Sequence, residues 1–192
     1  DKSMIIKSIA VGNQIEAYIE KLLSNNINII TSDDNNKGKT IIIQSIMYCL
    51  GNQPVFPSTF EYKKYYYYLE FSHNNCDYYM CRKGDTFIIF HEQNLMIFNS
   101  VSEMKRYWAK TIFPLPKIIK NDISRIVDPE LFVQLFFIGQ DKKDTSNISN
   151  KGFYTKDDFF NMIFSYANLS ATGLTQEEIH QKGSYEKKAK IA

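Results

Sequence analysis

The spacing of hydrophobic and polar residues predicts strands near the start of the chain. Met4 to Val11 (MIIKSIAV) is rich in β-branched residues and predicts a first strand. Gln14 to Leu23 fits two periods, because its apolar residues both alternate and recur at helical spacing, and its context favours a strand. Ile27 to Thr31 (INIIT) is a short β-branched run that predicts a further strand.

The middle of the chain predicts an antiparallel meander. Four strand-like runs are joined by the turn-like triplets HNN, KGD and EQN. The runs are Lys64 to Ser72, Cys76 to Arg82, Thr86 to His91 and Leu95 to Phe98. The tyrosines at positions 65 to 68 alternate between the two faces of such a sheet, so we expect core packing for two of them rather than a platform for stacked bases.

Helical spacing predicts three helices. Thr40 to Leu50 carries apolar residues at positions 42, 43, 46, 47 and 50, and Gly51 stands where a C-cap belongs. Ser102 to Ile112 has the same period, with its first residue as the N-cap. Tyr154 to Tyr166 begins with Thr155 as N-cap and two aspartates in the first turn.

Two segments near the end of the chain complete the pattern. The apolar run from Leu131 to Ile138 (LFVQLFFI) predicts a strand, and Gly139 and Gln140 follow it directly. The polar segment from Thr175 to Ile191 has sparse apolar positions, which fit a linker or the first heptads of a coiled coil. We therefore divide the chain into residues 1–170 and 171–192.

Composition narrows the class of protein. The 192 residues, 44% of them hydrophobic, can form one domain with a core and an extension. A net charge of +2 argues neither for nor against a nucleic-acid partner. Three cysteines without a C-x-x-C pair predict a reducing compartment and no disulfide or zinc framework. Because no apolar run is long enough to span a bilayer and no signal peptide is present, we expect a soluble, cytoplasmic protein with no membrane partner.

The segment SDDNNKGKT, residues 32–40, is the main candidate for chemistry. Its last three residues match the end of a phosphate-binding loop, and the predicted strand and helix on either side are the flanks that such a loop needs. Asp33 and Asn36 stand where glycines are expected. Asn enters the left-handed region readily, whereas the Asp33 carboxylate must point away from bound phosphates. The alternative is a polar loop, or a degenerate pocket that has lost its ligand.

The loop chemistry assigns a role to each residue. Lys39 would contact the β- and γ-phosphates of ATP, and the Thr40 hydroxyl would bind Mg²⁺. Gln140, at the end of the second apolar run, would contact Mg²⁺ or the attacking water, so Lys39 and Gln140 are the candidate catalytic pair. The full nucleotide-binding set is Asn35, Asn36, Lys37, Gly38, Lys39, Thr40 and Ile41.

This order of parts resembles the N-terminal lobe of the head of SMC-type ABC ATPases, the chromosome-maintenance and recombination-repair group. Those proteins show G-x-N-G-x-G-K-[ST] before a helix that ends in ALG, and Asn35, Gly38, Lys39, Thr40 and the pair LG at 50–51 match here. The stretch DPELFVQLFFIGQD is similar to their glutamine-bearing strand. The resemblance spans roughly residues 4–170. Within the family, the residues of the loop and of the glutamine-bearing segment are similar to those of the divergent SMC-like ATPases of anti-phage defence systems such as the Lamassu type.

The resemblance implies a fold and a set of partners. The fold would be α/β, a phosphate-loop NTPase of ABC-head type with a mixed sheet and an antiparallel meander. Heads of this family need a C-terminal lobe with Walker B carboxylates and a signature motif, and neither occurs in this chain. It would therefore bind nucleotide and depend on that lobe, from the same head or another chain, and on a second head for hydrolysis. DNA would be the expected partner, contacted by Lys63, Lys64, Lys105, Arg106 and Lys110.

Two further interpretations stay open at the level of sequence. The chain fits a non-catalytic interaction module whose degenerate loop binds nothing and whose meander holds a partner protein. A third interpretation, a small phosphate-loop kinase or GTPase, predicts an internal Walker B strand or a base-recognition motif, and neither is found. Asp128 is the nearest candidate for that strand's carboxylate, but Pro129 follows it and no second carboxylate is adjacent.

Overall fold

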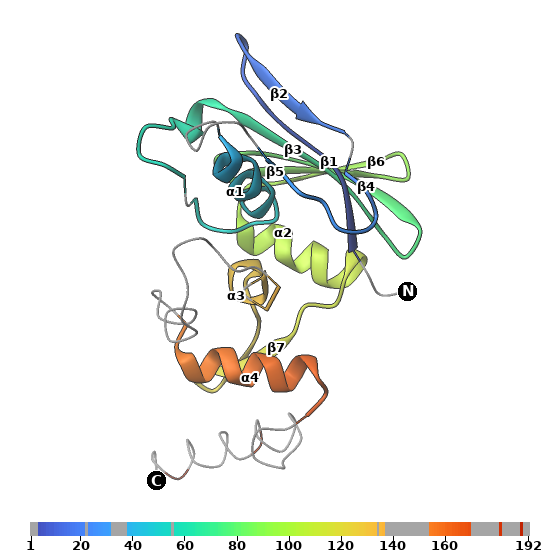
Figure 1. The fold of residues 1–192 in the computed structure, drawn as a ribbon. Helices are drawn as coiled ribbons and strands as arrows, with labels where there is room; N and C mark the ends of the chain where they lie inside the picture. The colour runs from blue at the N-terminus through green and yellow to red at the C-terminus, as the bar shows by residue number, and fades with distance from the viewer. Residues whose placement is uncertain are drawn as a thin grey trace. The chain divides into compact units, whose positions relative to one another are not determined.

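The computed structural model describes residues 4–21, 23–31, 38–54, 56–133, 135–136 and 154–169, together with 181 and 189. The chain forms two compact units, Asp1–Tyr107 and Trp108–Ala192, and each is described by itself below (Figure 1). The boundary that the sequence predicts, between residues 170 and 171, lies outside the described residues.

A six-stranded antiparallel sheet forms the centre of the first unit. Its spatial order is β2-β1-β3-β4-β5-β6. The strands are β1 (Met4–Gly12), β2 (Ala17–Glu20), β3 (Tyr66–His73), β4 (Cys76–Lys83), β5 (Thr86–His91) and β6 (Asn94–Phe98). The first strand, the strand within 14–23 and the four-stranded meander are thus confirmed. Every pair in this sheet is antiparallel, so the mixed sheet that we expected is not seen among the described residues.

Tight turns set the register of the meander. Asn74 and Asn75 both have positive φ, 51° and 62°, between β3 and β4. Glu92 and Gln93 do the same between β5 and β6, at 45° and 67°. Two positive φ angles are typical of type I′ hairpin turns, whose twist matches that of the flanking strands. Asn tolerates this conformation well, whereas Glu and Gln adopt it at a cost.

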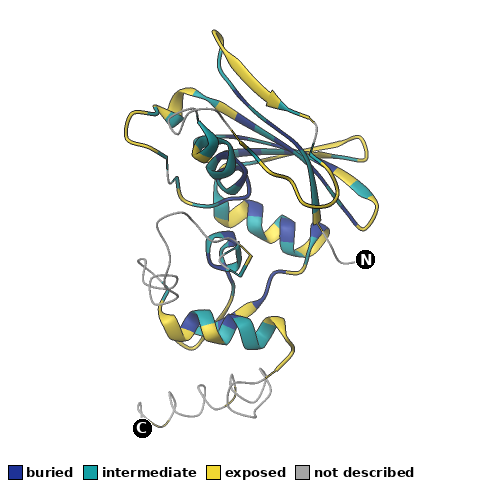
Figure 2. Ribbon diagram, in the orientation of Figure 1, coloured by how far each residue is buried: buried dark blue, intermediate teal, exposed yellow. Residues whose placement is uncertain are grey.

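The core lies on one face of this sheet, under helix α1 (Lys39–Cys49). Side chains alternate between faces along each strand, and β3 shows a strict exchange of buried and less buried positions (Figure 2). Fully buried residues on the inner face are Tyr67, Leu69, Phe71, Met80, Phe87 and Ile89. Helix α1 packs on β1, β3 and β4 (Figure 1), which fixes its direction relative to the sheet.

The strand predicted at residues 27–31 is wrong. This segment has no regular structure, and Ile27 and Ile29 are 88% and 82% exposed. Strand β1 is already paired with β2 on one side and β3 on the other, so it offers no free edge to a further strand. A β-branched run without a neighbour to pair with gains nothing from the extended ladder.

Helix α2 (Val101–Tyr107) follows the meander and passes into a π-helical turn, η2 (Trp108–Ile112). The N-cap is two residues earlier than predicted. The Ser100 hydroxyl accepts a hydrogen bond from the Glu103 N–H at 3.2 Å, whereas Ser102 lies inside the helix. The helix itself is confirmed, with Met104 and Trp108 buried.

The second unit contains a hairpin that we did not predict. It comprises β7 (Lys117–Lys120) and β8 (Ile123–Ile126), joined through Asn121 and Asp122 with φ of 53° and 58°. Two β-branched runs separated by Asn-Asp were the signal that sequence reasoning missed. The capped helix predicted after Tyr154 is confirmed as α4 (Lys156–Tyr166).

The strand predicted from Leu131 is also wrong where the structure describes it. Residues 129–133 form helix α3 (Pro129–Val133), whose first bond runs from the Leu131 N–H to the Asp128 carbonyl at 3.0 Å. Proline suits the first position of a helix, because its φ is helical and it has no N–H to satisfy. A short continuous apolar run does not by itself separate helix from strand.

Candidate functional site

The N-terminus of α1 places the Gly-Lys-Thr residues on the first turn of a helix. Gly38 is the N-cap residue and has φ of 79° and ψ of 4°, the left-handed conformation. The first helical hydrogen bond runs from the Ile42 N–H to the Gly38 carbonyl at 3.1 Å. The N–H groups of Lys39, Thr40 and Ile41 therefore have no acceptor within the helix.

The N-cap residue, Gly38, has no side chain that could cap this helix, and the first turn carries no acidic residue. A Cβ atom placed on Gly38 would meet no described atom within 4 Å. Thr40 is exposed and Lys39 half-buried. A left-handed residue before a right-handed one turns successive N–H groups toward a common point, as in anion-binding nests. The site is thus a concentration of N–H donors with a lysine beside it.

The structure brings together only part of the predicted set. Gly38, Lys39, Thr40 and Ile41 lie on one turn, as predicted. Asn35, Asn36, Lys37 and Gln140 lie outside the described residues. The pairing of Lys39 with Gln140 therefore stays a prediction.

The opposite end of α1 is closed by its own chain. Gly51 has φ of 102°, and its N–H donates to the Tyr48 carbonyl at 3.0 Å. The Asn52 N–H donates to the Met47 carbonyl at 3.1 Å. These two bonds form a Schellman motif, which satisfies the last carbonyls of the helix. The predicted glycine stop is confirmed.

Arg82 fastens this closed end to the sheet, a role that sequence reasoning missed. Its Nη1 donates to the carbonyls of Tyr48 at 2.5 Å and Asn52 at 2.8 Å, and its Nε donates to Gly84 at 2.8 Å. The guanidinium also lies 3.7 Å from the centre of the Tyr48 ring. Burial lowers the pKa of Arg82 from its usual value. A charge at an inward position of an alternating strand was the available signal.

Aromatic rings surround the same end of the helix. Tyr48 makes edge contacts with Phe56, Tyr62 and Tyr67 at centroid distances of 5.6, 5.7 and 4.8 Å. Of the tyrosines at 65 to 68, Tyr67 is fully buried here, whereas Tyr66 on the other face is 53% exposed. Core packing, as expected, accounts for Tyr67. Helix α1 is therefore held firmly at one end and left open at the other.

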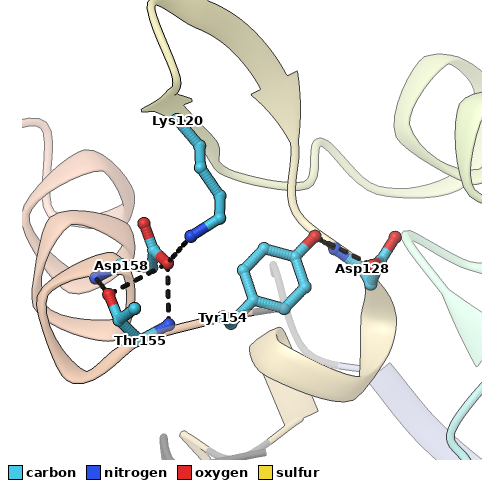
Figure 3. A network of polar contacts seen from close by, with 5 residues as sticks. All are labelled: Lys120, Asp128, Tyr154, Thr155 and Asp158. Carbon is cyan, nitrogen blue, oxygen red and sulfur yellow. Dashed lines mark hydrogen bonds and ion pairs between the residues drawn. The ribbon is translucent and has the colours of Figure 1, made fainter. Parts of the chain in front are cut away.

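A second polar cluster lies in the second unit, where it joins β7 to α4 (Figure 3). Asp158 Oδ2 accepts hydrogen bonds from Lys120 Nζ at 2.6 Å and from the Thr155 N–H at 2.7 Å. The Thr155 hydroxyl in turn accepts from the Asp158 N–H at 3.3 Å, which completes a capping box. Burial opposes ionisation of Asp158, but the bonds from Lys120 and Thr155 outweigh it and hold the pKa of this carboxyl below its usual value.

Asp128, the candidate for a Walker B carboxylate, belongs to the same region (Figure 3). Its Oδ2 accepts a hydrogen bond from the Tyr154 hydroxyl at 2.8 Å, and its N–H donates to that hydroxyl at 3.2 Å. Burial raises the pKa of Tyr154, as does the hydrogen bond to Asp128. This carboxylate therefore fixes the start of α3 against the strand bridge at Tyr154, which is a structural task.

The basic residues named for DNA lie on three separate elements. Lys63 and Lys64 are exposed on the short helix η1 (Tyr62–Lys64), where Lys64 pairs with Glu61 at 2.5 Å. Lys105 and Arg106 lie in α2 of the first unit, and Lys110 lies in η2 of the second. The structure thus places no continuous basic stripe among them within one element.

A cavity of about 680 Å³ opens beside β1 and β2. It is lined by Lys7, Ser8, Ala10, Ile19, Lys21, Leu23, Asn25, Tyr68 and Glu70. None of the four described loop residues is among them. The charged side chains here are partly paired, since Lys7 binds Asp77 at 2.6 Å and Ser8 donates to Glu70 at 3.0 Å.

Comparison with known proteins finds a distant similarity. The chain is 26% identical over 150 residues to the Lamassu protein LmuB of Bacillus cereus (strain VD014). The match covers 77% of this chain but only 26% of LmuB, so the chain spans about a quarter of that relative's length. No protein-family model matches the chain. Among the described residues, no helix has the length and apolar character needed to cross a membrane.

Proposed function

We propose that this chain is the ATP-binding half of an SMC-like ATPase head in a Lamassu-like anti-phage defence system. The proposal gives it the α/β fold of a phosphate-loop NTPase, with the N-terminal lobe of an ABC-type head in the chain and the C-terminal lobe supplied from elsewhere. Heads of this kind dimerise on ATP and act on DNA. The distant similarity to LmuB supports the link to defence.

The observation that carries the proposal is the start of α1. A glycine with φ of 79° leads directly into a helix whose first two residues are lysine and threonine. Free N–H groups and the helix dipole favour an anion at this point, and the first turn of the helix carries no acidic residue to oppose it. These features fit a phosphate group, and they occur together at the position that sequence reasoning selected.

Each residue at the start of α1 would have its own role in binding ATP. Lys39 would neutralise the terminal phosphates, the Thr40 hydroxyl would hold Mg²⁺, and the N–H groups from Gly38 to Ile41 would orient the phosphates. ATP bound there would supply the charged group through which two heads join. Hydrolysis would need Gln140, a second head, and the carboxylates and signature motif of the other lobe.

The direct test is calorimetric titration of the chain with ATP and Mg²⁺. Lys39→Ala should weaken binding at least tenfold, because it removes the one charge that contacts the terminal phosphates. Lys63→Ala is the matched control, since this exposed lysine lies on η1, whose Tyr62 packs against the closed end of α1. Equal affinity in the wild type and Lys39→Ala would contradict the assignment.

A non-catalytic interaction module is the second candidate, and the irregular segment before the loop favours it. Ile27 and Ile29 are exposed instead of forming the strand that normally precedes a phosphate loop. Under this hypothesis the wild type and Lys39→Ala both fail to bind ATP, even when the remaining part of the head is supplied.

A further inference from the structure

The hairpin turns at one end of the meander bring a cysteine, a histidine and a glutamate together. Cys76 is the first residue of β4, directly after the turn at 74–75. His91 is the last residue of β5, and Glu92 opens the next turn. One residue beyond the last pair of β4 and β5, Tyr79 with Phe90, the rings of Tyr78 and His91 stack at a centroid distance of 4.1 Å. Strand pairing therefore fixes the three residues relative to one another.

The donor atoms of these residues lie close enough to share one ion. Cys76 Sγ, a ring nitrogen of His91 and a carboxylate oxygen of Glu92 all lie within 4.8 Å of one another. The shortest recorded of these separations, His91 Nε2 to Glu92 Oε2, is 3.7 Å. Ligands of a tetrahedral zinc ion lie about 3.5 Å apart, from bond lengths of about 2.0–2.3 Å. The Glu92 side chain is 72% exposed, so it has room to move toward the other two ligands.

The histidine is already oriented as a ligand. His91 Nδ1 lies 2.8 Å from the Asp77 carbonyl oxygen. A carbonyl only accepts, so Nδ1 carries the proton and Nε2 of the neutral ring keeps its lone pair. Histidines that bind metals usually donate their other N–H to a carbonyl or carboxylate in this way. The lone pair faces the side where Glu92 lies.

We propose that Cys76, His91 and Glu92 form a binding site for a zinc-like transition-metal ion. A thiolate, an imidazole and a carboxylate together suit Zn²⁺, whereas Mg²⁺ and Ca²⁺ prefer oxygen ligands alone. Binding takes the thiolate form of Cys76 and releases its proton to solvent. Three protein ligands leave a fourth position for water, which the half-exposed setting of the cluster allows.

The cysteine pattern predicts no zinc framework, and this proposal departs from that expectation. The three ligands come from the start of one strand, the end of the next and a turn, so no fixed short spacing marks them in the sequence. A plain ion pair between His91 and Glu92 would explain the 3.7 Å contact. It would not explain a thiol at the same point, nor would it require that thiol for metal binding. The two interpretations therefore predict different results for a cysteine variant.

The test uses the full chain after dialysis against a chelator, titrated first with Co²⁺ and then with Zn²⁺. The site predicts one Co²⁺ per chain with a thiolate-to-cobalt charge-transfer band, and displacement by one equivalent of Zn²⁺. Cys76→Ser should abolish the band, and His91→Gln should weaken Zn²⁺ binding at least tenfold. Cys81→Ser is the matched control, because this half-buried cysteine lies on the same strand outside the cluster.

Two results would overturn the proposal. One is the absence of a stoichiometric Co²⁺ complex in the folded wild type. The other is a Co²⁺ spectrum in Cys76→Ser equal to that of the wild type, with Cys81→Ser losing the band instead. Far-UV circular dichroism of each variant confirms that the sheet is intact. Because Cys76 and His91 are partly exposed near turns, both substitutions should leave the fold unchanged.

Discussion

Helices α1 and α4 are equal in length but differ in how their N-termini are capped. Helices α1 and α4 each have 11 residues. In α4, Thr155 and Asp158 form a capping box, Asp157 adds a charge to the first turn, and Lys120 binds Asp158. In α1, the N-cap is Gly38, which has no side chain to cap the helix, and the first turn carries no acidic residue.

The difference shows where the chain uses its polar groups for stability and where it leaves them available. The N–H groups at the start of α4 have acceptors within the chain, and the negative charge beside them complements the helix dipole. At the start of α1, the N-cap residue Gly38 supplies no side-chain acceptor. The stability of the helix comes instead from the closed C-terminal end, where Arg82 and the Schellman motif hold it. An open, glycine-started helix end with a lysine is the arrangement that a phosphate can complete.

The largest predicted effect comes from removing the carboxylate of α4. Asp158→Ala deletes the partner of Lys120, whose side chain is only 13% exposed, together with the two hydrogen bonds that Asp158 Oδ2 accepts from the Thr155 N–H and hydroxyl. We expect a loss of about 3 kcal/mol in the free energy of unfolding of the second unit, the cost of breaking a buried pair. Trp108, the one tryptophan of the chain and part of that unit, reports this unfolding through its fluorescence. A change below about 0.5 kcal/mol would show that the network contributes nothing to stability.

Acid should remove part of the same stabilisation. The pKa of Asp158 is lower in the folded chain than its usual value, so its contribution is present above that usual value, near 4. It is lost as the pH falls through the lower, folded-state pKa. Asp158→Asn should therefore unfold with a flatter dependence on pH between about 2 and 5 than the wild type does. Parallel pH profiles for the two proteins would rule out Asp158 as a source of acid sensitivity.

Removing the cap alone should cost less. Thr155→Ala eliminates the hydroxyl that accepts from the Asp158 N–H but keeps the contact between Lys120 and Asp158. The expected loss is about 1 kcal/mol, as for other N-cap threonines. Thr155→Ser, which keeps the hydroxyl, is the control and should stay within about 0.5 kcal/mol of the wild type. Trp108 fluorescence in urea measures both.

The smallest effect on stability is expected at the open helix end. Lys39→Ala introduces the best helix former at a residue that makes no side-chain capping bond. The free energy of unfolding should therefore change by no more than about 0.5 kcal/mol. Urea unfolding followed by far-UV circular dichroism tests this. A loss above about 2 kcal/mol would mean that Lys39 has a structural partner in the folded chain and is not available to bind a ligand.

The elements that the sequence predicts well are those whose signals agree at several levels. The meander combines alternating strands with turn residues, and α1 combines helical spacing with a glycine stop at Gly51, so both are confirmed. The apolar runs at 27–31 and 131–138 offered hydrophobicity alone. In the first case strand β1 is already paired on both sides, and in the second Pro129, two residues before the run, starts a helix instead. Pairing partners decide such cases, and they are not local.

The residues of the candidate sites also differ in how far the sequence could predict them. Gly38, Lys39 and Thr40 are adjacent in sequence, so a local motif could find them. Arg82 meets the end of α1 from a strand some thirty residues away, and Cys76 meets His91 across the pairing of β4 with β5. No spacing rule links such residues, because strand register brings them together. Their only signals in the sequence are a charge at an inward position and a thiol near a turn.

The most direct test of the account is the shift in melting temperature caused by Mg²⁺ and ATP in the wild type and in Lys39→Ala. Without ligand the two proteins should melt together, since the open end of α1 contributes little to stability. With Mg²⁺ and ATP at about 100 times the dissociation constant, the wild type should gain about 2.7 kcal/mol, and Lys39→Ala should gain far less at the same concentrations. Equal shifts in the two proteins would contradict the claim that the start of α1 is a phosphate site.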